Sequence, residues 1–292
     1  MQSYEQEPWL NQALKFFEEE KLDELVLFES GKVILTQQQI NHKTTKIKLS
    51  KDFTHELQKF VFKQRLRLDP FSPFAGGKLS CSSFRWHCVM PPVSKESLFF
   101  LRKHRFSSLT LNDFCFLHDS YEKIQKIIED KKSFVIAGPT GSGKTSLLTA
   151  LLYSYFKEKR VVILEDYDEL PVLSDLWFKL TATKEAINHK TFFPLDFLFR
   201  EVLRMRPDQT VLGELRGTEL KTFIELCNSG HQTTCSTMHA SSAAELKVRM
   251  KMILAKEKIS AESILAESNL WVIFLERSTN GSLIRKVEPV LF

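Results

Sequence analysis

The sequence predicts an α/β protein in which a smaller α+β unit precedes a larger unit built on a parallel sheet. Short apolar segments alternate with amphipathic ones from about residue 111 onward, which is typical of strand–helix–strand repeats. The glycine-rich stretch GPTGSGKT, at 138–145, separates one such strand from the helix that follows it. Hairpin and strand patterns surround a single clear helix earlier in the chain. We therefore expect one domain at 1–108 and a second at 109–292.

The first domain is expected to contain two helices and four strands. A leading helix is expected within residues 1–21, and residues 22–37 are typical of a hairpin that turns near Ser30 and Gly31. Residues 82–90 and 97–103 have strand character. The second helix lies in 52–66, where four apolar residues recur at helical spacing: Phe53, Leu57, Phe60 and Val61.

The second domain is expected to alternate four core strands with its helices. The strands are expected at 133–137, 160–165, 209–214 and 233–239, and the helices at 119–132, 144–159, 197–205, 219–228 and 242–258. Asp119 or Ser120 is expected to cap the first helix, and Ser242 with Glu245 forms a capping box for the last. The chain then closes with a hairpin that turns at Asn280 and Gly281.

The composition excludes several classes of protein. No apolar run approaches the roughly 18 residues that a membrane helix needs, and the acidic N-terminal sequence does not resemble a signal peptide. The 5 cysteines form no C-x-x-C pair, which argues against a disulfide scaffold or a zinc site. Residues 1–110 carry 17 lysines and arginines against 12 acidic residues, which fits either a solvated surface or an anionic partner.

The stretch GPTGSGKT matches the pattern of a phosphate-binding loop. Glycines let successive backbone N–H groups point at phosphate oxygens, and the positive end of the next helix adds to the attraction. Lys144 can reach the β- and γ-phosphates and Thr145 can hold Mg²⁺. We expect the whole loop to bind nucleotide through Gly138, Pro139, Thr140, Gly141, Ser142, Gly143, Lys144, Thr145 and Ser146.

Functional side chains stand at the ends of three other expected strands. Glu165, Glu214 and His239 each close such a segment, as Gly138 closes the strand before the loop. Because ligands bind beyond the carboxyl ends of strands in an open parallel sheet, we expect all three to face the phosphate on Lys144. Either glutamate could orient the attacking water, and His239 could sense the γ-phosphate.

Two further features bear on catalysis. Many phosphate-loop enzymes hold Mg²⁺ with an aspartate just before the strand-end glutamate, and here that position is Gly213. We therefore expect Mg²⁺ on Thr145, with Glu214 acting through water. Four arginines lie nearby in the sequence, and they either form salt bridges or donate charge across a subunit boundary: Arg200, Arg204, Arg206 and Arg216.

Three segments resemble the secretion-superfamily traffic ATPases, and specifically their type IV secretion and Tad-type pilus assembly branch. LEDYDEL at 164–170 resembles the acidic box, LRMRPDQTVLGELRGTEL at 203–220 the Walker B region, and SGHQTTCSTMHASSA at 229–243 the histidine box. A weaker likeness covers SSFRWHCVMPPVS at 82–94. The tetracysteine module of type II secretion and pilus extension motors is absent from the sequence.

The resemblance implies a ring hexamer whose subunits each join a PAS-like N-terminal domain to a RecA-like P-loop NTPase domain. It implies that Glu165 and Glu214 are the acidic-box and Walker B glutamates, and that His231 and His239 belong to the histidine box. It also implies that Arg85 and Arg102 approach the phosphates. The sequence departs from the family at Tyr167 and Thr233, which are smaller residues in most members.

These observations together favour an ATP-hydrolysing motor for pilus assembly or protein secretion, with ATP and Mg²⁺ as cofactors. Its expected partners are other copies of the chain and inner-membrane platform or secretion-channel proteins, without direct nucleic acid. We expect a cytoplasmic protein that reaches the inner membrane through those partners. Two alternatives remain open: a nucleotide-gated scaffold with little turnover, and a RecA-like nucleic-acid translocase.

Overall fold

The computed structural model describes twelve stretches of the chain, which fall into two compact units, one ending at residue 103 and one beginning at residue 110. The domain boundary expected after residue 108 lies outside the described residues. The described stretches are 7–19, 22–37, 41–79, 84–103, 110–166, 168–182, 193–217, 219–228, 233–260, 264, 269–278 and 281–290.

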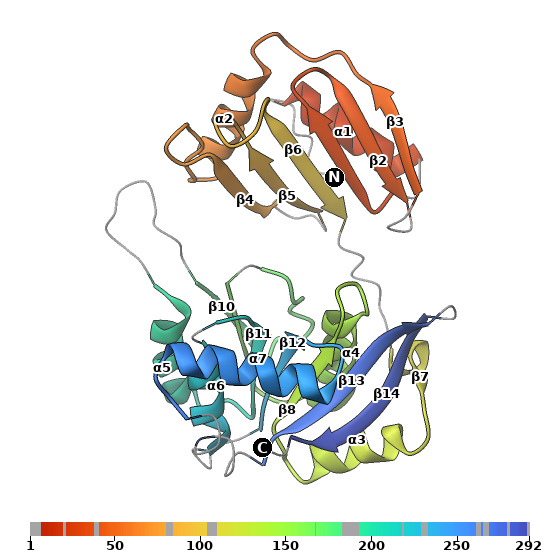
Figure 1. Cartoon of the computed structure of the whole chain (residues 1–292), viewed down its shortest axis with the longest axis vertical. Helices are drawn as coiled ribbons and strands as arrows, with labels where there is room; N and C mark the ends of the chain where they lie inside the picture. Colours follow the sequence, from red (N-terminus) through yellow and green to blue (C-terminus); the bar gives the residue numbers. More distant parts are fainter. Residues whose placement is uncertain are drawn as a thin grey trace. The chain divides into compact units, whose positions relative to one another are not determined.

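The N-terminal unit is a six-stranded antiparallel sheet with two helices packed on one face (Figure 1). The helices are α1 (Pro8–Glu19) and α2 (Phe53–Lys63). The strands follow the order β3-β2-β1-β6-β5-β4. Their bounds are β1 (Glu24–Phe28), β2 (Lys32–Gln37), β3 (Asn41–Lys46), β4 (Phe74–Lys78), β5 (Phe84–Val89) and β6 (Leu98–Lys103).

Local sequence explains most of this unit. The hairpin of β1 and β2 turns where expected, at Gly31, whose φ of +79° suits glycine. The four residues at helical spacing in α2 are the buried ones, as predicted. Trp9 of α1 meets the rings of Phe53, Phe60 and Phe99 edge-on, with centroids 4.9–5.6 Å apart. This aromatic cluster joins both helices to the sheet.

The C-terminal unit is an eight-stranded, mainly parallel sheet in the order β10-β9-β11-β12-β8-β13-β14-β7. Its strands are β7 (Cys115–Phe116), β8 (Phe134–Gly138), β9 (Val161–Glu165), β10 (Trp177–Thr181), β11 (Gln209–Leu215), β12 (Thr233–His239), β13 (Trp271–Ser278) and β14 (Gly281–Pro289). The helices are α3 (Ser120–Glu129), α4 (Lys144–Phe156), α5 (Leu195–Met205), α6 (Glu219–Asn228) and α7 (Ala243–Lys256), with the 3₁₀ turn η1 (Leu111–Asp113).

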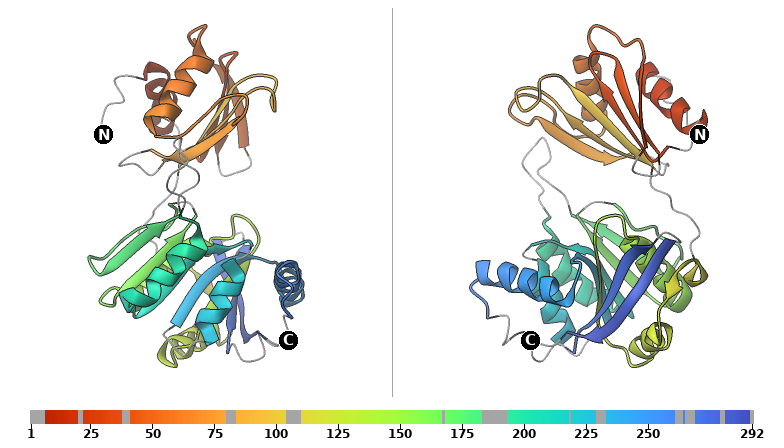
Figure 2. Two further views of the ribbon diagram at one scale, coloured as in Figure 1. Left: turned by 90° about the vertical axis from the view of Figure 1, so that its left-hand side faces the viewer. Right: turned by 45° about the vertical axis from the view of Figure 1, so that its right-hand side comes forward.

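Helices cover both faces of this sheet (Figure 2). Apolar residues of α5, α6 and α7 pack on one face, and those of α3 and α4 pack on the other. The central strands β8, β9 and β12 are buried along almost their whole length, as expected for strands covered on both sides. The predicted α/β class with a smaller α+β unit is confirmed.

Several local predictions need correction. The N-terminal sheet has six strands and not the four expected, because β3 and β4 were not predicted. Strand β10 was not predicted, although it pairs in parallel with β9 at the edge of the sheet. The last hairpin pairs Ser278 with Gly281, so Gly281 belongs to the strand and not to the turn. In the capping box, Ser242 Oγ accepts the Glu245 N–H as expected, but the Glu245 carboxylate accepts from the backbone of Ser241.

Among the described residues, no helix is both long enough and apolar enough to span a membrane.

Candidate functional site

The phosphate-binding loop follows β8 and leads into α4, as expected. Gly141 and Gly143 have φ values of +75° and +96°, which only glycine adopts without strain. A Cβ atom at Gly138 would lie 2.2 Å from the carbonyl oxygen of Leu275, so the backbone passes too close for any side chain. These glycines let the loop curl at the N-terminus of α4, where backbone N–H groups and the positive end of the helix dipole can bind an anion.

Lys144 is the first residue of α4 and is folded back over the loop. Its Nζ atom donates to the carbonyl oxygens of Gly138 at 3.0 Å and Pro139 at 2.9 Å. It also lies 3.3 Å from Nδ1 of His239. The side chain is largely buried, and burial lowers its pKa from the ordinary value.

His239 ends the strand that lies between β8 and β11. Its register partner in β8 is Gly138, so the imidazole stands beside the phosphate loop. Nδ1 faces the Lys144 ammonium and the Thr140 hydroxyl, at 3.3 and 3.4 Å, while Nε2 lies 2.9 Å from Oε1 of Glu214. Because an ammonium can only donate, these partners assign the ring proton to Nε2.

Glu214 reaches His239 because β11 is irregular at this point. The register between β11 and β12 shifts between Leu212 and Leu215, which is a β-bulge. Bulges re-aim side chains next to active sites. The second carboxylate oxygen of Glu214 accepts from Nε of Arg216 at 2.7 Å, and the Arg216 Nη2 atom donates to the same oxygen. Arg216 was one of the four nearby arginines, and this pairing is of the salt-bridge kind expected for them.

The charges around His239 keep its imidazole neutral. Burial lowers its pKa, and the nearby Lys144 ammonium lowers it further, while the Glu214 carboxylate opposes both. The result is a chain of polar contacts in which Lys144 bonds to His239 and His239 Nε2 lies near Glu214 Oε1, although that oxygen accepts no hydrogen bond from the described residues. This chain links the phosphate loop to the end of a strand two positions away in the sheet.

Glu165 occupies the end of β9 but is held differently from Glu214. Its carboxylate accepts the backbone N–H groups of Glu169 and Leu170, and Oε2 lies 3.1 Å from the Nζ atom of Lys179. Burial raises its pKa, and Lys179 opposes that rise. A Cβ atom at Gly213 would come within 3.0 Å of Glu165. Glu165 therefore borders the site through Gly213, while its carboxylate oxygens accept hydrogen bonds from the loop that follows β9.

The residues around the loop fit a bound Mg²⁺–nucleotide. Thr145 and Ser146 follow Lys144 in the first turn of α4, where a hydroxyl can ligate Mg²⁺ beside a phosphate. The Glu165 side chain takes the space beside Gly213, where an aspartate side chain would meet it. Among the described residues, no cluster of three or more His, Cys, Asp or Glu side chains could hold a metal ion. The Thr145 hydroxyl, phosphate oxygens and water would hold Mg²⁺, with Glu214 acting through water.

Arg204 and Arg206 do not join the phosphate loop within one chain. Arg204 pairs with Glu201 near the end of α5, and Arg206 terminates that helix with a φ of +48°. Both precede β11, whose first residue pairs with Thr233 at the start of β12. They therefore lie at the edge of the sheet opposite the loop. Thr233, a departure from the resembled family, is bonded to Gln209 at that same remote edge.

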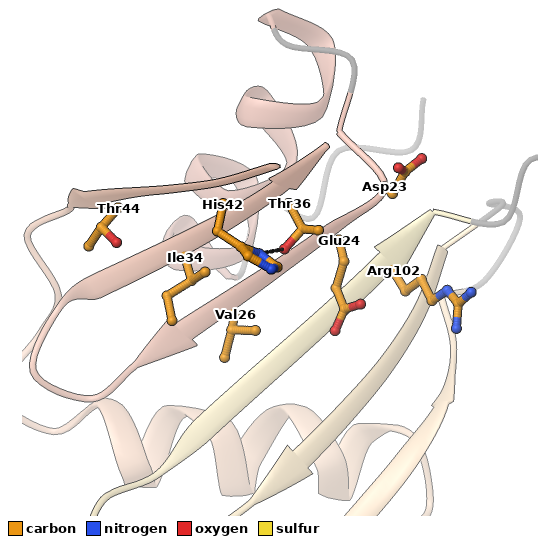
Figure 3. Close-up of a pocket in the computed structure, with 8 residues that line it drawn as sticks. All are labelled: Asp23, Glu24, Val26, Ile34, Thr36, His42, Thr44 and Arg102. Carbon is orange, nitrogen blue, oxygen red and sulfur yellow. Dashed lines mark hydrogen bonds between the residues drawn. The ribbon is translucent and has the colours of Figure 1, made fainter. Parts of the chain in front are cut away.

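Arg85 and Arg102 lie in the N-terminal unit, where they are register partners on β5 and β6. Arg102 lines a pocket of about 580 Å³ on this sheet. Figure 3 shows the residues that line it. Asp23 and Glu24 line it as well, and His42 bonds to Thr36 at 3.0 Å. Two carboxylates make this pocket alone a poor site for a polyphosphate. His231 and Tyr167 lie outside the described residues.

Comparison with known proteins shows which family the chain belongs to. The family model described as type II/IV secretion system protein matches residues 82–277, more than half of the chain. The chain belongs to this family. It is 31% identical over 197 residues to the putative conjugal transfer protein Rv3659c of Mycobacterium tuberculosis, covering 64% of this chain and 56% of the relative. The chain thus spans little more than half of that relative's length.

Other known proteins are similar over comparable or larger parts of the chain. The conjugal transfer protein TrbB of Rhizobium radiobacter is 26% identical over 229 residues, which cover 75% of this chain and 68% of that protein. Among solved structures, the Legionella pneumophila ATPase DotB superposes with a TM-score of 0.61 at 17% identity, covering 92% of this chain and 76% of DotB. The pilus retraction motor PilT with bound ADP superposes with a TM-score of 0.65 at 17% sequence identity, covering 95% of this chain and 81% of PilT. These structures share the fold.

Proposed function

We propose that the chain is an ATP-hydrolysing subunit of a ring hexamer that powers pilus assembly or protein secretion across the bacterial cell envelope. One observation carries the proposal: Lys144, His239 and Glu214 form a continuous polar chain beside the phosphate loop. Membership of a secretion-system family supports the cellular role.

We propose a role for each residue of this polar chain and for the phosphate loop beside it. Lys144 and the loop N–H groups bind the phosphates, and Thr145 ligates Mg²⁺, which neutralises charge on the phosphate oxygens when bound. Glu214 orients and polarises the attacking water, because its oxygens face two side chains that can move, whereas those of Glu165 are fixed by backbone donors. His239 connects occupancy of the loop to the position of Glu214.

The remaining parts of the proposal concern assembly. Arg204 and Arg206 lie away from their own loop, so they act, if at all, on the nucleotide of a neighbouring subunit. Arg85, Arg102 and His231 approach the phosphates in the assembled ring. The proposed partners are other copies of the chain and inner-membrane platform or secretion-channel proteins, which hold the protein on the cytoplasmic side of the membrane.

Steady-state turnover of the purified chain tests the proposal. We expect Mg²⁺-dependent release of phosphate from ATP that is lost in Lys144→Ala and falls on the order of 100-fold in Glu214→Gln. Lys221→Met is the control, because that exposed lysine makes one loose contact of 3.9 Å with Glu225. Mass measurement in solution with and without ATP tests for six copies.

The same assay separates the alternatives. ATP binding without turnover in the wild-type ring would favour the nucleotide-gated scaffold. Turnover stimulated by single-stranded DNA at low salt, together with DNA binding, would favour the nucleic-acid translocase. Turnover that survives Lys144→Ala would reject the motor.

A further inference from the structure

Lys179 is a mostly buried lysine on β10, the edge strand beside β9. Its side chain is 15% exposed, and its ammonium group has three partners. Nζ lies 3.1 Å from Oε2 of Glu165 and 2.5 Å from Oδ1 of Asp168, and it donates to the carbonyl oxygen of Leu170. An ammonium has three N–H groups, so this environment uses all of them.

The register of the two strands brings Lys179 to Glu165. Thr181 of β10 is the partner of Glu165 in β9, and Lys179 stands two residues earlier on the same face of the sheet. A long side chain spans such a diagonal. The carboxylate of Glu165, 2% exposed, is thus bound on one side by Lys179 and on the other by the backbone N–H groups of Glu169 and Leu170.

Glu165 in turn borders the strand that carries Glu214. Leu212 of β11 pairs with Leu164 of β9, so Gly213 stands beside Glu165, and a Cβ atom there would meet the Glu165 side chain at 3.0 Å. Gly213 lies within the bulge that aims Glu214 at His239. A movement of the Glu165 side chain therefore acts on the segment that aims Glu214.

We propose that Lys179 is a positioning residue for ATP hydrolysis. It fixes the Glu165 carboxylate and the turn at Asp168–Leu170 against β10, and so keeps the bulge at Gly213 in the shape that aims Glu214. This inference rests on the proposed function. Lys179 has no described contact with the phosphate loop, so its loss changes the rate of the chemical step and leaves nucleotide binding intact.

Lys179 holds Glu165 in place through its charge as well as through packing. Replacing Lys179 with methionine keeps most of the side-chain volume but leaves the buried Glu165 carboxylate without a cation. The carboxylate then takes up a proton or turns outward, and the Leu170 and Glu169 amides lose their acceptor. Arginine keeps the positive charge with a different shape, so we expect Lys179→Arg to hold the Glu165 carboxylate nearly as well as the wild-type lysine does.

The test compares Lys179→Met, Lys179→Arg and the control Lys221→Met in the full chain. We expect kcat for ATP to fall about 10-fold to 100-fold in Lys179→Met, with the KM and the Kd of a fluorescent ATP analogue nearly unchanged. Hydrogen exchange of the Leu170 and Glu169 amides should accelerate in Lys179→Met, remain close to wild type in Lys179→Arg, and be unaffected by Lys221→Met.

Two results would overturn the inference. One is unchanged turnover and unchanged amide exchange in a folded Lys179→Met protein. The other is an exchange increase that spreads equally over β8 and β12 and is not reduced in Lys179→Arg, because that would mean a general loss of structure. If the wild-type chain hydrolyses no ATP, the proposed function fails. Amide exchange at Leu170 and Glu169 in Lys179→Met then alone shows whether Lys179 positions Glu165.

A double variant decides the case in which Lys179→Met does not fold. Glu165→Gln with Lys179→Met removes both charges and leaves an amide that still accepts from the Leu170 N–H. If the double variant folds while Lys179→Met does not, the charge pair is the cause and the inference stands. If both are equally unfolded, the lysine is needed for packing and the inference is wrong.

Discussion

The Nε2 atom of His239 lies 2.9 Å from Oε1 of Glu214, so an imidazole on one strand meets a carboxylate on the next. On its other side the same ring faces the Lys144 ammonium at 3.3 Å. Since a phosphate would compete for that ammonium, we expect nucleotide binding to change the hydrogen bonding of His239 and, through it, the contact of the ring with Glu214. The two residues therefore form the connection between ligand and catalytic carboxylate in the proposed mechanism.

Substitution of His239 with glutamine breaks this connection at one end. The amide can still donate toward Glu214, but it is too flexible to hold Lys144 at the same time. We expect kcat for ATP to fall about 10-fold with little change in KM, because an orienting partner is lost rather than a phosphate ligand. Steady-state kinetics beside Glu214→Gln measures this. An equal rise in KM would instead make His239 a phosphate ligand.

The neutral state of His239 predicts a pH dependence of stability. Its pKa in the folded protein is below 6.5, so the unfolded chain binds the proton first as pH falls. Its contribution to stability is thus present above pH 6.5 and is lost as pH falls from there toward the lowered pKa. The charged groups that influence the pKa of the ring are Lys144, Glu214, Arg216 and Arg249.

Chemical denaturation of the nucleotide-free protein between pH 5 and 7.5 measures this dependence. We expect the wild-type free energy of unfolding to decrease on acidification more steeply than that of His239→Asn, which carries no titrating ring. Glu165 has a raised pKa and contributes with the opposite sign, and the difference between the two proteins cancels it. Parallel curves for the two proteins would contradict a neutral, half-buried His239.

Strand ends were the predictable part of the site. Apolar runs ending in Glu165, Glu214 and His239 are local signals, and parallel pairing necessarily brings such ends to one edge. The bulge in β11 and the edge strand β10 have no comparable signal. WFKLT carries a lysine in its centre, and only the pairing with Glu165 makes that lysine a buried residue. Lys179 was missed for this reason, and the contact of Arg216 with Glu214 was not specified.

The aromatic cluster of the N-terminal unit predicts a large stability effect. Phe60 is 1% exposed and contacts the rings of Trp9, Trp86 and Phe99. We expect Phe60→Ala to lower the free energy of unfolding by about 3–5 kcal/mol, because it removes a buried ring and leaves a cavity. Phe62→Ala is the matched control on the same helix, since Phe62 is 69% exposed. Similar losses in thermal unfolding for both variants would contradict the described packing.

Gly213 predicts a coupling between stability and turnover. A methyl group at this position would lie 3.0 Å from Cγ and 3.1 Å from Oε1 of Glu165, both closer than ordinary contact. Glu165 cannot retreat freely, because Lys179 and the Leu170 N–H hold it. We expect Gly213→Ala to cost about 1–3 kcal/mol of stability and to reduce ATP turnover by displacing Glu214.

Gly217→Ala is the control, since its added methyl would meet only the flexible end of Glu219, at 3.3 Å. Denaturant titration and turnover are measured on both variants. A Gly213→Ala protein with wild-type stability and turnover would show that the contact between β9 and β11 does not constrain Glu214.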